Sequence, residues 1–208
     1  LTNLKAFLGF CVERDFIEKN PAQYIKPFPF KSKIRKPLDK KTVNIMLAAL
    51  KGTKFYEFCL TGLLTGLRKA ELINLQWADV DFNNGVITVR HRGDFSTKNR
   101  KERIVPMPKK LQDALRDIRN RADKPVFIHK NGQRFANNLY RDIERILKTV
   151  GIPKIEFHQL RHTYISNLTK AGISPGKIMQ WSGHSDYNVT ANVYTHLTEY
   201  DPDVERIV

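Results

Sequence analysis

The 208-residue chain carries 36 lysines and arginines against 21 aspartates and glutamates, which gives a formal net charge of +15. Its hydrophobic fraction of 41% is ordinary for a globular protein, and no stretch approaches the roughly 20 apolar residues of a transmembrane helix. Two cysteines, Cys11 and Cys59, indicate buried thiols rather than a disulfide framework. The basic excess favours a polyanionic partner, most often nucleic acid; a protein that is simply basic is the alternative.

The N-terminal region divides into a helical segment and a basic segment. Residues 3–19 repeat apolar side chains at a helical period, and Pro21 is expected to end this helix soon after Asn20. Residues 26–41 contain seven lysines or arginines, three prolines and one acid. Because prolines disfavour both helix and sheet, this segment is predicted to be an extended linker. On composition alone it would be a solvated spacer.

Two helices are predicted next. Asp39 can cap the first of them, which is expected to end near Gly52. The second is expected over residues 54–64, with a break at residues 65–66 and a continuation of the helix to residue 75.

A small sheet interrupts the helices. Side chains alternate over residues 86–90 after a turn at residues 83–85, and a second short strand near residues 103–105 is expected to pair with the first. Helices are then predicted at about 108–121, 136–150, 158–171 and 174–181, with a further helix around residue 194. The predicted fold class is mainly α-helical with a small antiparallel β-sheet.

Five residues in four segments form the most informative pattern. They are Arg68 in TGLRKAEL, His158 and Arg161 in HQLRH, His184 in SGHSD, and Tyr194 in VYTH. A guanidinium is a planar fork of donors that grips two phosphate oxygens, and histidines donate hydrogen bonds or move protons near neutral pH. A tyrosine is an oxygen nucleophile once its developing charge is stabilised. Together these residues predict an active site for a phosphodiester.

This set of segments, in this order, resembles the tyrosine recombinase (phage integrase) family over about residues 40–200. The resemblance implies an integrase-type catalytic domain at residues 39–208, a basic linker at 25–38, and the tail of an N-terminal core-DNA-binding domain at 1–24. It also implies a site-specific DNA recombinase that integrates or excises DNA through a 3′-phosphotyrosyl intermediate and requires neither metal nor other cofactor.

The resemblance also implies partners and a setting. Such enzymes act on double-stranded DNA at recombination sites as homotetramers, in some cases with a directionality factor. A cytoplasmic, nucleoid-associated protein of a prokaryotic host is expected, and the phage and mobile-element branch is preferred over the chromosomal one. Basic residues of the linker are then expected to lie along DNA; these are Lys31, Lys33, Arg35 and Lys36.

The family pattern assigns roles to Arg68, Glu71 and His184. Arg68 matches the first catalytic arginine and Glu71 the acid that orients it, although R-x-x-E alone would be a surface ion pair of little energetic value. His184, beside a glycine that permits close approach of the substrate, matches the residue that hydrogen-bonds the scissile phosphate.

The HQLRH segment supplies two catalytic residues by resemblance, His158 and Arg161, which project to one side of a helix. His162 is then a supporting hydrogen-bonding residue. The alternative is a zinc site, but Gln159 stands where the zinc-binding H-E-x-x-H pattern has glutamate, and no third ligand is evident nearby.

The nucleophile and the general acid complete the set. Tyr194 matches the family's nucleophile; its competitors by proximity are Tyr164, Tyr187 and Tyr200. Lys98 matches the lysine of the family's hairpin and would protonate the leaving 5′ oxygen, since the pKa of a lysine drops when cations crowd it. An ordinary DNA contact is the alternative for Lys98, and Lys101 could be confused with it. Backbone phosphates are expected to be contacted by Arg90, Arg92, Arg100, Lys101 and Arg103.

Two other functions stay open at this point. A type IB topoisomerase-like nicking-closing enzyme uses similar residue types, but HQLRH followed closely by GH and YTH favours the integrase pattern. A catalytically silent DNA-binding accessory protein is the second alternative, and the intact set from Arg68 to Tyr194 argues against it.

Overall fold

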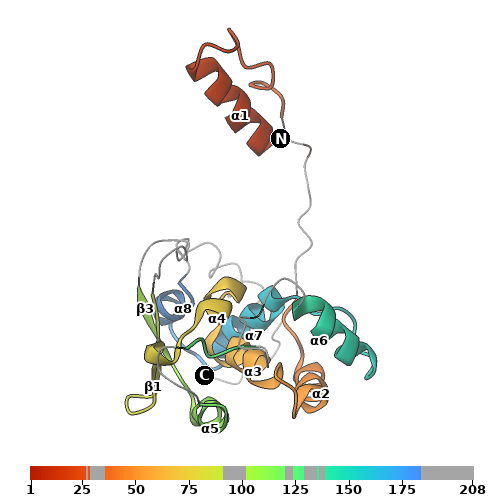
Figure 1. The fold of residues 1–208 in the computed structure, drawn as a ribbon, viewed down its shortest axis with the longest axis vertical. Coiled ribbons are helices and arrows are strands. Elements are labelled where there is room, and N and C mark those ends of the chain that lie inside the picture. Colours follow the sequence, from red (N-terminus) through yellow and green to blue (C-terminus); the bar gives the residue numbers. More distant parts are fainter. Residues whose placement is uncertain are drawn as a thin grey trace, which may run out of the picture. The chain divides into compact units, whose positions relative to one another are not determined.

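The computed structural model describes residues 1–26, 28, 36–90, 102–119, 124–128, 135 and 139–183. The chain forms two compact units, Leu1–Ile34 and Arg35–Val208, which are described separately (Figure 1). Within the described ranges, no helix is both long enough and apolar enough to cross a membrane.

The first unit is built on one helix, α1 (Thr2–Glu13). This helix is shorter than the predicted 3–19, because Asp15 adopts a left-handed conformation with φ 57° and turns the chain well before Pro21. The side chain of Asn20 then donates to the carbonyl of Lys5 at 3.0 Å, which folds the following segment back along α1. Several large apolar side chains of the helix are exposed, among them Phe7 and Phe10.

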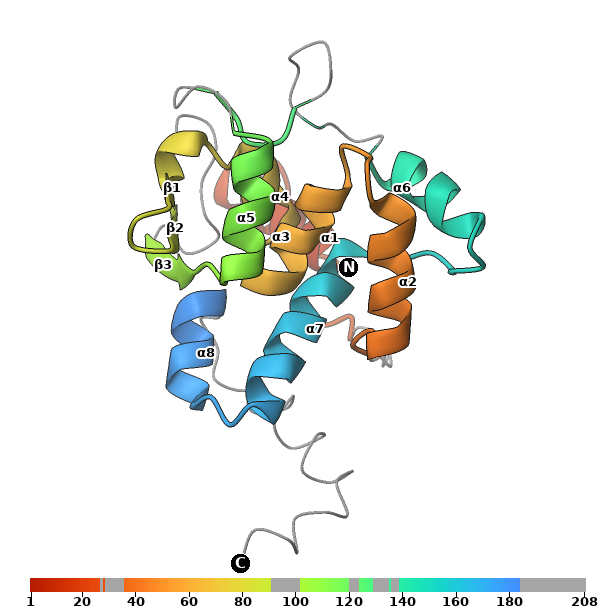
Figure 2. The ribbon, with the colours of Figure 1, turned by 90° about the horizontal axis from the view of Figure 1, so that it is seen from below.

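Four helices line much of the core of the second unit. They are α2 (Lys40–Leu50), α3 (Tyr56–Thr65), α6 (Leu139–Lys148) and α7 (Phe157–Lys170). The α3 helix packs against α7, and α2 packs against α6 (Figure 2). Phe58 contacts the rings of Phe127, Phe135 and Phe157, with centroids 5.1–5.4 Å apart. As predicted, Asp39 caps α2, accepting a hydrogen bond from the amide of Thr42 at 2.8 Å.

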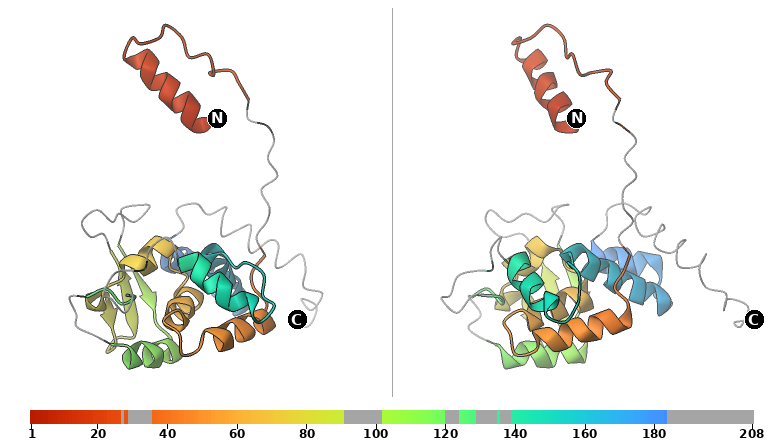
Figure 3. Two further views of the ribbon diagram at one scale, coloured as in Figure 1. Left: turned by 45° about the vertical axis from the view of Figure 1, so that its right-hand side comes forward. Right: turned by 90° about the vertical axis from the view of Figure 1, so that its right-hand side faces the viewer.

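A three-stranded antiparallel sheet stands at one side of the helices (Figure 3). Its order is β1 (Val80–Asp81), β2 (Val86–Val89) and β3 (Arg103–Pro106), and its register pairs Val89 with Arg103. The sequence predicted β2, β3 and the intervening direction change, but not β1 or the short 3₁₀ helix η1 (Trp77–Asp79) before it. Helix α5 (Lys109–Asp117) follows β3.

Two glycines with left-handed backbone conformations end the helices that flank the site. Gly66, with φ 63°, ends α3, and α4 (Lys69–Asn74) begins three residues later. Gly183, with φ 67°, ends α8 (Pro175–Ser182), which packs against β3 and α7. The predicted break at residues 65–66 is therefore a change of direction that brings the start of α4 toward α7 and α8.

Candidate functional site

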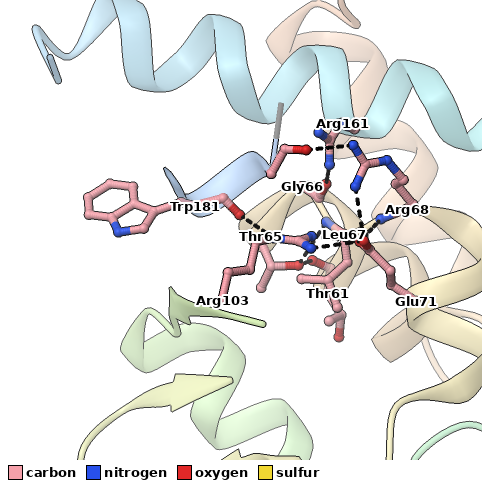
Figure 4. Close-up of polar contacts among 10 residues, drawn as sticks. Thr61, Thr65, Gly66, Leu67, Arg68, Glu71, Arg103, Arg161 and Trp181 are labelled. Atoms are coloured by element: carbon pink, nitrogen blue, oxygen red, sulfur yellow. Dashed lines mark hydrogen bonds and ion pairs between the residues drawn. The ribbon is translucent and has the colours of Figure 1, made fainter. Parts of the chain in front are cut away.

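A buried carboxylate, Glu71, organises the site. It lies in the first turn of α4 and is 4% exposed. Its two oxygens accept hydrogen bonds from the backbone amide of Arg68 at 2.7 Å and from Arg68 Nη1 at 3.0 Å. They also accept bonds from Arg103 Nη1 at 2.9 Å and Nη2 at 2.6 Å, a bidentate pair (Figure 4). The R-x-x-E spacing is thus a buried network rather than a surface ion pair.

Arg103 occupies a different place from the one expected. The sequence predicts a phosphate contact in a basic turn, whereas its side chain is 7% exposed and its fork is engaged by Glu71. Its Nε also donates to the carbonyl of Trp181 at 2.9 Å. Strand alternation explains the difference: Arg103 shares a face of β3 with buried Val105 and pairs with buried Val89, so its side chain points inward. That period-2 pattern is the sequence signal that could have identified its burial.

Arg68 joins α4 to the end of α8. It stands just before α4, and its Nη2 donates to the carbonyl of Gly183 at 2.7 Å. With 24% of its side chain exposed, it is the most accessible of the three arginines in the cluster. Two of the five N–H donors of its guanidinium are engaged by Glu71 and Gly183. The other three have no partner within the described residues and are available to a ligand.

Arg161 is the deepest charge in the molecule's described part. It is 2% exposed, and its Nη1 donates to the carbonyl of Gly66 at 2.7 Å. Its Nη2 is buried and has no hydrogen-bond partner among the residues that the structure describes. An unpaired buried cationic donor costs free energy unless a ligand completes it.

The electrostatics of the cluster favour an anion. Three guanidiniums surround one carboxylate, which leaves a net charge of two positive units. Burial, and then the nearby charge of Arg68, lower the pKa of Arg161 to about 9, so that it stays protonated at neutral pH. Burial also raises the pKa of Glu71, but the hydrogen bonds and charges of Arg103 and Arg68 outweigh it and hold that pKa below its ordinary value.

Tyr164, one of the alternative candidates for the nucleophile, packs inside the protein. Its side chain is buried under Gly66, and a Cβ built on that glycine would clash with its ring. Burial raises the pKa of its phenol to about 12, which disfavours phenolate. Tyr164 therefore supports the backbone whose carbonyl holds Arg161.

The two described histidines lie at the start of α7. The rings of His158 and His162 are 5.0 Å apart and nearly perpendicular. His158 is exposed, three residues before Arg161, while His162 is half-buried. Within the residues that the structure describes, no three histidine, cysteine or acidic side chains gather as a metal site would require.

Several predicted site residues lie outside the described residues. They are Lys98, His184 and Tyr194 of the catalytic set, and Lys31, Lys33, Arg35, Arg92, Arg100 and Lys101 of the basic set. The alternative nucleophiles Tyr187 and Tyr200 lie outside them too. Gly183, held through its carbonyl by Arg68, immediately precedes His184. Of the remaining basic residues, Lys36 is exposed, and Arg90 is 39% exposed and pairs with Asp79 at 3.1 Å.

The fold of this chain is similar to those of solved integrases in complex with DNA. The Tn1549 transposon integrase in complex with a circular intermediate DNA superposes with a TM-score of 0.76 at 26% identity, over 97% of this chain and 74% of that one. The fold is that of a tyrosine recombinase catalytic domain. The chain belongs to the phage integrase family, which it matches over residues 36–200.

Curated relatives agree with the fold. The tyrosine recombinase XerC-like protein of Caldanaerobacter subterraneus is 28% identical over 93% of this chain and 60% of the relative. Tyrosine recombinase XerC of Chlamydia trachomatis is 31% identical over 95% of this chain and 65% of the relative. The chain thus spans a little under two thirds of the length of these relatives.

Proposed function

We propose that this chain is the catalytic part of a site-specific DNA recombinase that cuts and rejoins strands through a 3′-phosphotyrosyl intermediate. The observation that carries the proposal is the buried, unpartnered Nη2 of Arg161 in a cluster of three guanidiniums and one carboxylate. Such a site is complementary to a phosphodiester whose charge grows in the transition state.

Each predicted site residue then has a distinct role. Tyr194 gives its phenolic proton to water and attacks the scissile phosphorus as phenolate. The bond from phosphorus to the 5′ oxygen breaks, and Lys98 gives that oxygen a proton. Arg68 and Arg161 donate to the non-bridging oxygens and stabilise the pentacoordinate transition state. His158 and His184 complete the donors around the phosphate, with His162 in support. Attack by a different 5′ hydroxyl reverses the step, releases Tyr194 and joins the new strands.

The substrate and assembly follow from the same proposal. The substrate is double-stranded DNA carrying a recombination site, and the working form is a homotetramer on two duplexes, directed by an accessory factor. The basic linker, with exposed Lys36 at its described end, contacts phosphates along the duplex. Phosphate contacts of this kind position the protein without reading sequence.

Two alternative functions use similar residues but differ from this proposal in what the protein does to DNA. A topoisomerase-like enzyme would relax supercoiled plasmid that lacks any cognate site. A silent accessory protein would bind DNA and form no covalent product. The net positive charge around Arg161 supports binding in all three cases. The covalent step therefore separates the accessory protein from the two enzymes, and relaxation of plasmid without a cognate site separates the topoisomerase from the recombinase.

The test is covalent trapping on nicked suicide duplexes, in which the freed 5′ end diffuses away and religation fails. The chain is incubated with duplexes drawn from the ends of the mobile element that encodes it, with EDTA present, and resolved on a denaturing gel. A protein–DNA adduct that is absent from Tyr194→Phe supports the proposal. An adduct that survives in Tyr194→Phe identifies another nucleophile, and bound DNA without any adduct favours the accessory protein.

A further inference from the structure

We propose that Arg103 is a positioning residue, which clamps Glu71 and the end of α8 together and thereby fixes Arg68 on the scissile phosphate. The inference rests on the proposed function for its catalytic consequence and on the contacts of Arg103 for its structural one. It replaces the phosphate-contacting role that the sequence predicts for this residue.

The clamp has one arm on α4. Both Nη atoms of Arg103 donate to the two oxygens of Glu71, at 2.9 and 2.6 Å, with side chains 7% and 2% exposed. The same two oxygens accept from the backbone amide and Nη1 of Arg68. A bidentate guanidinium fixes the plane of a carboxylate, so Arg103 sets the direction in which Glu71 holds Arg68.

The other arm lies on α8. Arg103 Nε donates to the carbonyl of Trp181 at 2.9 Å, and two residues later the carbonyl of Gly183 accepts from Arg68 Nη2 at 2.7 Å. A Cβ built on Gly183 would lie 3.1 Å from the Cδ, Nε and Cζ atoms of Arg103. Gly183 therefore has two requirements for glycine, a φ of 67° and the close approach of this guanidinium.

Arg103 thus lies behind the phosphate-binding face rather than on it. Every donor atom of its guanidinium is engaged by protein. Within the described part of the chain, by contrast, Arg68 keeps free donors and Arg161 has an unpartnered Nη2. A group that acts through Arg68 is expected to change the rate of strand cleavage more than the affinity for DNA. Misplacement of a catalytic group by about 1 Å can cost on the order of a hundredfold in rate.

The first test compares Arg103→Lys with the unaltered chain. Lysine keeps the positive charge but loses the fork. On a trapping duplex at saturating DNA, the single-turnover rate of adduct formation is expected to fall about tenfold or more, with the DNA dissociation constant changed by less than about twofold. The same substitution made in a Glu71→Gln background is expected to cost much less, because the clamp acts through Glu71. Equal costs in both backgrounds would overturn the proposal.

The second test does not depend on folding of the Arg103 variant. Gly183→Ala presses a methyl group on Arg103, while Gly172→Ala, at a similar φ of 72° with open space around it, imposes backbone strain alone. The rate of adduct formation is expected to fall in Gly183→Ala and to be retained in Gly172→Ala. Equal effects of the two substitutions would contradict a specific contact with Arg103.

Amide hydrogen exchange, which does not require activity, tests this inference separately from the proposed function. In glycine-labelled protein, the amide of Gly183, which donates to the carbonyl of Met179 at 2.8 Å, is expected to exchange with solvent several-fold faster in Arg103→Lys. The amide of Gly66 is the internal reference. Faster exchange with no adduct from the unaltered chain would reject the recombinase and retain the clamp. Unchanged exchange at Gly183 would reject the clamp, whether or not the chain cleaves DNA.

Discussion

Two regions of the molecule place a pair of cations around one carboxylate, with opposite consequences. On α5, Asp113 accepts from Lys109 at 2.9 Å and from Arg116 at 3.1 Å, and all three side chains are 42–75% exposed. At the candidate site, Glu71 accepts from Arg68 and Arg103 at similar distances, but its side chain is only 2% exposed. Water screens the first cluster, so it contributes little, whereas desolvation makes every partner of the second indispensable. Position in the fold, not residue type, decides how strongly the charges of each cluster interact.

The largest expected effect comes from Glu71→Ala. Removing the carboxylate leaves buried Arg103 without its main partner, a change that typically costs about 3–5 kcal/mol. Urea unfolding is expected to show a loss of about 3 kcal/mol, and suicide-duplex trapping a loss of most cleavage. Glu71→Gln, which keeps the shape and loses the charge, serves as the matched variant. A Glu71→Ala protein with unchanged stability would mean that the buried cluster is screened like the exposed one.

A smaller effect is expected from acid, which should weaken the stabilisation that the buried Glu71 cluster provides. The folded-state pKa of Glu71 lies below its unfolded value. Burial alone would raise this pKa, but the hydrogen bonds and charges of Arg103 and Arg68 lower it further than burial raises it. Its contribution to stability is therefore complete above about pH 4.3, the ordinary glutamate pKa, and is lost as pH falls through the folded pKa. The stability difference between the unaltered chain and Glu71→Gln, followed by urea unfolding, is expected to be constant from pH 7 to pH 5 and to shrink below that. A difference that grows on acidification would reverse the assigned sign.

The smallest effect is expected from Asp113→Asn. A hydrogen bond from Lys109 lowers the pKa of this carboxyl, but its side chain is 55% exposed. The midpoint of thermal unfolding and the rate of adduct formation are both expected to match those of the unaltered chain within measurement error. A clear loss of stability would show that exposed pairs on α5 matter as much as the buried ones.

Much of the fold could be predicted from the sequence because its signals are local. The Asp39 cap, the break at residues 65–66 and the alternation over residues 86–89 each depend on neighbouring residues. Strand β1 was missed because two residues are too few to show an alternation. The η1 helix before it depends partly on a distant segment, since the amide of Trp77 donates to the carbonyl of Lys124 at 3.2 Å. Helix α1 was predicted too long because one left-handed residue, Asp15, outweighed the apolar period.

The candidate site shows the same division. The family resemblance singled out Arg68, Glu71 and Arg161, and the structure brings their side chains together. Their catalytic roles stay a prediction. Arg103 could not be assigned correctly from charge, because a basic turn favours DNA contacts while strand alternation favours burial. Only the register of β3 against β2 shows that alternation prevails. Lys98, His184 and Tyr194 remain predictions from sequence.

The most direct test of the account is the crystal structure of the chain covalently trapped on a nicked duplex. The account predicts a phosphate joined to Tyr194, with its non-bridging oxygens within hydrogen-bond distance of Arg161 Nη2 and of the Arg68 guanidinium. Arg103 is predicted to keep its bidentate contact with Glu71. A phosphate bound elsewhere, with Arg161 Nη2 still unpartnered, would contradict the assignment of this cluster as the active site.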